Sequence, residues 1–112
     1  MIGIEQVALA VEQAESKGQW WAKSKSGCRG VMQVCPEWAK VPKAWLWLPD
    51  VNRDEGRRLL AYWLGKAHGR WLPALAAYRC GWGGLRGKCG SRYALHVLRN
   101  VQQRAATLPP SV

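Results

Sequence analysis

Apolar side chains in this sequence recur at the spacing of helix faces, and no segment alternates apolar and polar residues over the length of a strand. Segments 3–15, 52–67 and 91–106 each place an apolar stripe on one helical face. Segment 71–79 reads as a further helix with Pro73 near its first turn. Because such stripes must be buried against one another, the sequence predicts an all-α, or mainly α, fold.

Capping signals indicate where these helices begin and end. Asn52, followed three residues later by Glu55, resembles a capping box and predicts a helix start at Asn52. Gly69 is expected to end that helix, and Ser91 to cap the last one, which the proline pair at 109–110 would end. Segments 17–29 and 80–90 are rich in Gly and predict loops, whereas "KAWLWL" predicts irregular structure or one short helix.

Length and charge bound the class of protein. A chain of 112 residues suits a single domain spanning 1–112. The 17 Lys and Arg against 7 Asp and Glu give a net charge of +10, which predicts an anionic partner, although a solvated basic surface explains it equally well. No signal peptide or transmembrane segment is recognisable, so we expect a protein made in the cytoplasm.

Cysteine and histidine positions offer two kinds of site. The four cysteines are Cys28, Cys35, Cys80 and Cys89. They can form disulfides in any of three connectivities, among which the sequence does not choose. A zinc site with His68 or His96 is the alternative, but C-x6-C and C-x8-C lack the short spacing that presents two thiolates to one ion. We therefore expect no metal.

The Gly-rich segment 80–90 invites a nucleotide-binding interpretation. A phosphate-binding loop ending at Gly87 and Lys88 would need a glycine at the position of Trp82. The dinucleotide fingerprint fails as well, because Arg86 stands at its third glycine. The sequence thus predicts no cofactor.

Glu15 is the acid whose position is hardest to explain as an ordinary surface residue. It falls inside the apolar arc of helix 3–15, at the end where the helix dipole is negative. Loss of water and the dipole both raise the pKa of a carboxyl, and a protonated carboxyl can donate a proton to a leaving oxygen. The alternative is an acid that simply ends a helix.

Four motifs resemble the catalytic domain of lytic transglycosylases, which shares its fold with goose-type lysozyme. Glu15-Ser16 is followed by Ser24 and then by "GCRGVMQ", which ends at Gln33, with the family's spacing and no gap. Further along, "DVNRDEGRRLL" keeps the family's Asn and Gly, "ALAAYRCGWGG" resembles its Tyr motif, and "YALHVLRNV" resembles the closing helix. The resemblance covers residues 4 to 102 and implies a lysozyme-like fold.

The resemblance also implies a reaction and its residues. Glu15 would protonate the glycosidic oxygen between N-acetylmuramic acid and N-acetylglucosamine in peptidoglycan, then act as base on the muramyl 6-hydroxyl to form a 1,6-anhydro end. Substrate-binding positions would be Ser24, Met32, Gln33 and Tyr78. We add Trp82 as a ring that stacks on sugar, although it could equally pack under its loop.

The chain departs from the family pattern beside the Tyr motif. Arg79 stands where the family has Asn, and Cys28 and Cys80 stand where it has Ala. An arginine there could contact a peptide carboxylate or a lactyl group, and the cysteines could brace the groove.

Taken together, the residues and the resemblance predict a peptidoglycan-degrading enzyme that acts on the cell wall. We expect a phage-encoded endolysin used in lysis or carried in the virion, whose positive charge favours anionic wall polymers or lipopolysaccharide. One alternative is a true lysozyme of the same fold, which uses water as the nucleophile. Another is a non-enzymatic basic module that binds nucleic acid or membrane through helix 91–106; for the enzyme we expect no nucleic-acid partner.

Overall fold

The computed structural model describes residues 2–107 and contains five α-helices and two 3-10 helices in that part of the chain. The elements, in order, are α1 (Ile4–Ser16), η1 (Pro36–Trp38), η2 (Lys43–Trp47), α2 (Pro49–Lys66), α3 (Trp71–Cys80), α4 (Trp82–Leu85) and α5 (Ser91–Thr107). Residues 2–107 form no strand, only the isolated bridges of Arg29 with Lys23 and with Val34. The predicted all-α fold is confirmed.

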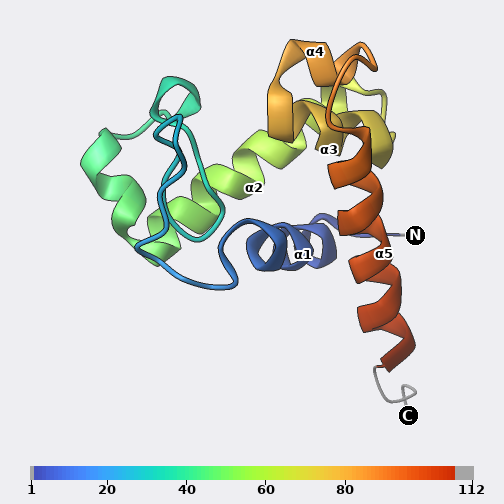
Figure 1. The fold of residues 1–112 in the computed structure, drawn as a ribbon, viewed down its shortest axis with the longest axis horizontal. Coiled ribbons are helices and arrows are strands. Elements are labelled where there is room, and N and C mark those ends of the chain that lie inside the picture. The colour runs from blue at the N-terminus through green and yellow to red at the C-terminus, as the bar shows by residue number, and fades with distance from the viewer. Residues whose placement is uncertain (1, 108–112) are drawn as a thin grey trace.

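The helices divide the molecule into two ends joined by α1 and α2. Figure 1 shows α3, α4 and α5 gathered at one end, and the segment between α1 and α2, with η1 and η2, at the other. Helix α2 reaches both ends, since it contacts η2 and α3, and α1 packs on α2 and α5. The long connection after α1 is therefore held opposite α3 and α4.

The core lies where the helix stripes meet. Val7 and Val11 of α1 are fully buried, together with Leu60 of α2, Leu75 of α3 and Val97 of α5. These residues belong to one cluster that also takes in Val31 and Met32 of a turn, and Val34 directly after it. The stripes predicted from the sequence are thus the surfaces that join the helices.

The predicted start of α2 is wrong. The helix begins at Pro49, where a proline suits the first turn, and Asn52 lies inside it. The Asn52 side chain is fully buried and binds the backbone of the segment before α2 instead of capping the helix. Glu55 accepts a hydrogen bond from the backbone nitrogen of Lys40, 2.6 Å away. Both side chains serve tertiary contacts, which override the local capping signal.

The other predicted boundaries differ in smaller ways. Helix α2 ends at Lys66, before Gly69. Ser91 is the first residue of α5 and not its cap, because the first helical hydrogen bond runs from the Ala94 nitrogen to the carbonyl oxygen of Gly90. The proline pair at 109–110 lies outside the described residues. The Gly-rich segment is less irregular than expected, because residues 82–85 form the single turn α4. "KAWLWL" forms the short helix η2.

Candidate active site

A groove of about 830 Å³ separates the two ends of the molecule. One wall comes from the segment after α1 and from η1, and the other from α3 and α4. The lining residues that carry polar, aromatic or sulfur groups are Glu15, Ser24, Lys25, Ser26, Cys28, Gln33, Cys35, Glu37, Trp38, Trp63, Tyr78, Arg79, Cys80 and Trp82. Five of the six site residues predicted from the sequence line this groove: Glu15, Ser24, Gln33, Tyr78 and Trp82.

Glu15 reaches the groove from the last turn of α1. The helix ends at Ser16, and Lys17 follows in the left-handed conformation with φ 55°. The Ser16 hydroxyl donates to the carbonyl oxygen of Val31 over 2.6 Å and accepts from the Gly18 nitrogen over 3.1 Å. The bond to Val31 ties the end of α1 to the segment that follows it, and the bond from Gly18 holds the turn after the helix, so the position from which Glu15 projects is fixed.

The Glu15 side chain is only 7% exposed, and its Oε1 lies 3.3 Å from Nη1 of Arg79. Burial raises the pKa of the Glu15 carboxyl, whereas the Tyr93 hydroxyl and the Arg79 charge lower that pKa in part, so the net shift is upward. A carboxyl with this balance holds its proton at a higher pH than an exposed glutamate does. The raised pKa expected from helix position is therefore present, with burial as its largest cause.

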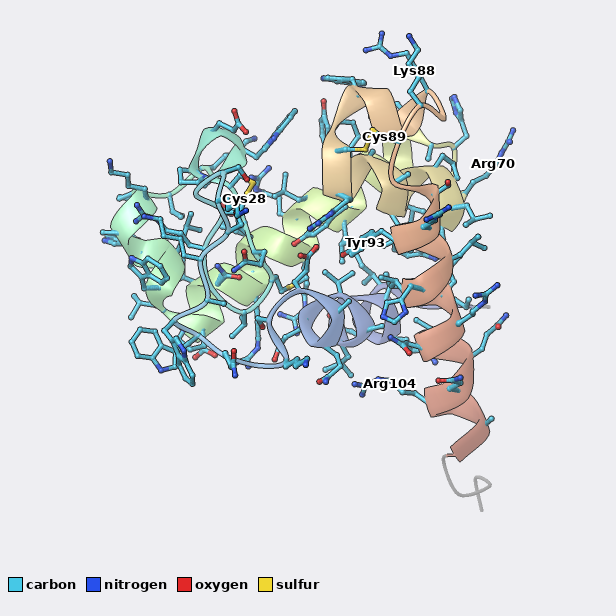
Figure 2. All side chains as sticks on the ribbon, in the orientation of Figure 1. Cys28, Arg70, Lys88, Cys89, Tyr93 and Arg104 are labelled. Carbon is cyan, nitrogen blue, oxygen red and sulfur yellow. A yellow bond between two sulfur atoms is a disulfide. The ribbon has the colours of Figure 1, made fainter. Side chains whose placement is uncertain are left out.

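Tyr93, on α5, is a functional candidate that the sequence analysis did not assign. Figure 2 shows its side chain pointing from α5 toward the middle of the molecule. Its hydroxyl is buried without a well-aligned hydrogen bond among residues 2–107, yet it lies close enough to interact with Glu15. Burial, and then the Glu15 charge, raise the pKa of Tyr93, so the hydroxyl stays protonated and can donate. It is suited to stabilising the Glu15 carboxylate.

Tyr78 lines the groove from the last turns of α3. Its hydroxyl donates to the carbonyl oxygen of Met32 over 2.6 Å, which ties α3 to the opposite wall. Burial, and then Glu15, hold the pKa of Tyr78 well above its usual value. Tyr78 is therefore a neutral neighbour of Glu15 whose proton is already engaged by a backbone carbonyl.

Ser24 and Gln33 lie on the wall opposite α3. The Gln33 side-chain nitrogen donates to the carbonyl oxygens of Ala22 and Gly30, at 2.9 and 3.0 Å. Ser24 Oγ accepts from the Cys28 backbone nitrogen over 3.0 Å. Ser24 Oγ also shares a hydrogen bond with Ser26 Oγ over 3.1 Å. The amide oxygen of Gln33 keeps capacity for a ligand.

Met32 departs from the predicted substrate-binding role. Its side chain is 1% exposed, lies in the core and does not line the groove. It packs so tightly on Gly56 that a Cβ at that glycine would overlap the methionine sulfur. The contribution of Met32 to the site is its backbone, which receives the Tyr78 hydroxyl.

Trp82 lies at the groove rim and is 41% exposed. Its ring meets Trp63 edge to face, with ring centroids 4.9 Å apart. The side chain therefore packs on Trp63 of α2 and still offers surface to the groove, and stacking on a sugar stays a prediction.

Two disulfides stand at the groove, Cys28–Cys35 on one wall and Cys80–Cys89 on the other. Figure 2 shows Cys28 and Cys89 on the two sides of the molecule. Among residues 2–107, no group of three or more His, Cys, Asp or Glu side chains is placed to hold a metal ion. The thiols that the sequence left open as zinc ligands are paired with each other.

Comparison with known proteins gives a consistent result. A family model described as "Transglycosylase SLT domain" matches residues 3–97. The 70 kDa soluble lytic transglycosylase of Escherichia coli has a similar fold, with a TM-score of 0.70 and 22% sequence identity, over 94% of this chain but only 19% of that protein. No curated protein matches the chain.

Proposed function

We propose that this chain, which belongs to the transglycosylase SLT domain family, cleaves the β-1,4 bond between N-acetylmuramic acid and N-acetylglucosamine in peptidoglycan. The observation that carries the proposal is Glu15, a carboxyl 7% exposed and of raised pKa at the wall of an 830 Å³ groove. We also propose that residues 1–112 act as one catalytic domain.

In the first step, protonated Glu15 gives its proton to the glycosidic oxygen as the bond to the muramyl anomeric carbon breaks. The bonding electrons leave with the oxygen, and positive charge develops at the anomeric carbon. The Glu15 carboxylate formed in this step lies beside the buried, protonated Tyr93 hydroxyl, which can donate to it.

In the second step, the Glu15 carboxylate removes the proton of the muramyl 6-hydroxyl, whose oxygen attacks the anomeric carbon. The products are a 1,6-anhydro end and a free 4-hydroxyl, and Glu15 is protonated again. Glu37 is the other acid that lines the groove, and it is exposed, whereas the Glu15 environment supports both proton transfers. One carboxyl is therefore sufficient for this proposal.

Product analysis tests this reaction against its alternative, a true lysozyme. We expect mass spectrometry of digested sacculi to show muropeptides 18 mass units lighter than hydrolysis products, because the 6-hydroxyl replaces water. Reducing ends without any anhydro species would show that water is the nucleophile and would overturn the transglycosylase proposal.

Anionic polymers, including lipopolysaccharide, are the second class of partner that we propose. No Asp or Glu follows Glu55, whereas most of the Lys and Arg residues do. Six exposed cations at the α3–α5 end make no ion pair with an acid of the described residues. We call them the basic helical surface: Lys66, Arg70, Arg86, Lys88, Arg92 and Arg99. Arg70 and Lys88 mark one side of it in Figure 2.

Binding to lipopolysaccharide should depend on this surface and on salt. We expect the double variant Arg92→Gln, Arg99→Gln to bind lipopolysaccharide vesicles about 30-fold more weakly at low salt, at about 1 kcal/mol per cation. The matched control removes two exposed cations from the other end, Lys23→Gln and Lys43→Gln. An equal loss in both double variants would mean that only net charge matters.

We also propose that the protein acts on the cell wall, in the periplasm or outside the cell. The two disulfides suit an oxidising compartment such as the periplasm or the outside of the cell. Among residues 2–107, no helix is long and apolar enough to cross a membrane. A phage source and a role in cell lysis stay predictions. The non-enzymatic nucleic-acid module would be favoured only by DNA binding together with lysis that persists without Glu15.

A further inference from the structure

We infer that Arg79 is a recognition residue for a carboxylate on the glycan substrate, and that binding of this carboxylate draws Arg79 away from Glu15. The inference rests on the proposed function and adds the chemical class of substituent that the groove selects. It starts from Arg79, a cation that lines the groove and contacts Glu15.

In the free protein, Arg79 makes a contact with Glu15 that opposes protonation of Glu15, the state from which the proposed reaction starts. Arg79 Nη1 lies 3.3 Å from Glu15 Oε1, and a guanidinium at that distance favours the ionised carboxyl. Glu15 must be protonated to donate to a glycosidic oxygen. The contact is therefore useful after proton transfer and unfavourable before it, unless the substrate alters it.

The geometry leaves Arg79 able to bind a second anion. The Arg79 side chain is 57% exposed, whereas Glu15 is 7% exposed, so the cation faces the groove and the acid lies behind it. Only one of its five N–H donors is engaged by a side chain or carbonyl of the described residues. The guanidinium also lies over the Tyr93 ring, 5.6 Å from its centroid, which holds its plane at the groove wall.

Charge at the rest of the groove agrees with this role. Tyr78 and Tyr93 lie beside Glu15 with neutral hydroxyls. Lys25 and Glu37 are the other charged residues that line the groove, and neither is paired with Glu15. Arg79 is thus the cation in direct contact with Glu15. A substrate carboxylate paired with Arg79 would neutralise the charge that favours ionised Glu15, so binding and proton retention would be coupled.

Peptidoglycan offers such a carboxylate from two sources. Peptide stems carry free carboxylates, and removal of a stem exposes the lactyl carboxylate of the muramyl residue. The experiment therefore uses three soluble glycans of equal length: one with stems, one stripped of stems, and one stripped with its lactyl carboxylates capped as methylamides.

We expect the wild-type kcat/KM to be about 10-fold or more higher on a carboxylate-bearing glycan than on the capped glycan, as for a charge-assisted hydrogen bond. Arg79→Asn, which restores the family residue, should bring this ratio close to one, and Arg79→Lys should recover part of it.

The three glycans also identify the source of the carboxylate. Preference for the stripped glycan identifies the lactyl group, and preference for the stemmed glycan alone identifies the peptide. Lys43→Asn, an exposed cation outside the groove and outside the basic helical surface, is the matched control.

A pH profile on the capped glycan gives an independent readout. Loss of Arg79 removes an interaction that lowers the pKa of Glu15, so the decline of activity at high pH should move to higher pH in Arg79→Asn. Unchanged ratios and an unchanged profile in a folded Arg79→Asn would overturn the inference while leaving the proposed function intact. Failure of the wild type to cleave any of the three glycans would instead count against the proposed function.

Discussion

Glu15→Gln is expected to reduce the rate of glycan cleavage by about 10²–10⁴-fold, the range in which a positioned general acid–base contributes. Glutamine has the shape of protonated glutamate and can keep a hydrogen bond to the groove, but it cannot transfer a proton. Because the proposal uses Glu15 in both steps, the loss should appear in kcat, with KM little changed. Release of soluble muropeptides from purified sacculi measures it.

The matched control for this variant is Glu5→Gln, the same substitution at the other end of the same helix. Glu5 lies in the first turn of α1, is 65% exposed and pairs with Arg57 outside the groove. We expect Glu5→Gln to keep wild-type kcat. A folded Glu15→Gln protein that degrades sacculi as fast as Glu5→Gln does would exclude Glu15 as the catalytic acid.

How far the sequence predicts this site depends on how local its signals are. The helix carrying Glu15 and the apolar face on which Glu15 lies follow from a 3.6-residue period, which needs no knowledge of the partner helices. The structure then adds what the period cannot supply, namely the neighbours of the buried carboxyl, which are Tyr78 and Arg79 of α3 and Tyr93 of α5. Tyr93 could have been found as the first residue of "YALHVLRNV", the motif that resembles the family's closing helix, although that match gave it no role.

Sequence reasoning failed where a side chain serves the backbone of a distant segment. Asn52 has the residue type of a helix cap, but it is used within α2 to bind segments before it. Met32 belongs to a motif expected to bind substrate, yet its side chain fills a space beside Gly56. In both cases the local signal was overridden by tertiary contacts, of which the longest join residues 20 or more positions apart, Asn52 with Met32 and with Arg29, and Met32 with Gly56.

The contacts of Asn52 predict the largest loss of stability. Its side-chain oxygen accepts from the Met32 nitrogen over 2.8 Å, and its nitrogen donates to the carbonyl oxygens of Arg29 and Leu46 over 2.7 and 2.8 Å. Asn52→Ala leaves these three backbone groups without that partner, at about 1–3 kcal/mol for each one that stays buried. We expect the free energy of unfolding to fall by about 3–6 kcal/mol, measured by urea denaturation with the disulfides intact.

Activity should be affected beyond the loss of folded protein, because Met32 also receives the Tyr78 hydroxyl at the groove. Molecules of Asn52→Ala that remain folded at low temperature should therefore show a reduced kcat. Asn100→Ala is the control, since the Asn100 side chain bonds to His96 on the exposed side of α5 and its loss should cost about 0.5 kcal/mol or less. If Asn52→Ala were as stable as Asn100→Ala, water or a shifted backbone would be satisfying the three groups, and Asn52 would not be what holds the groove wall to α2.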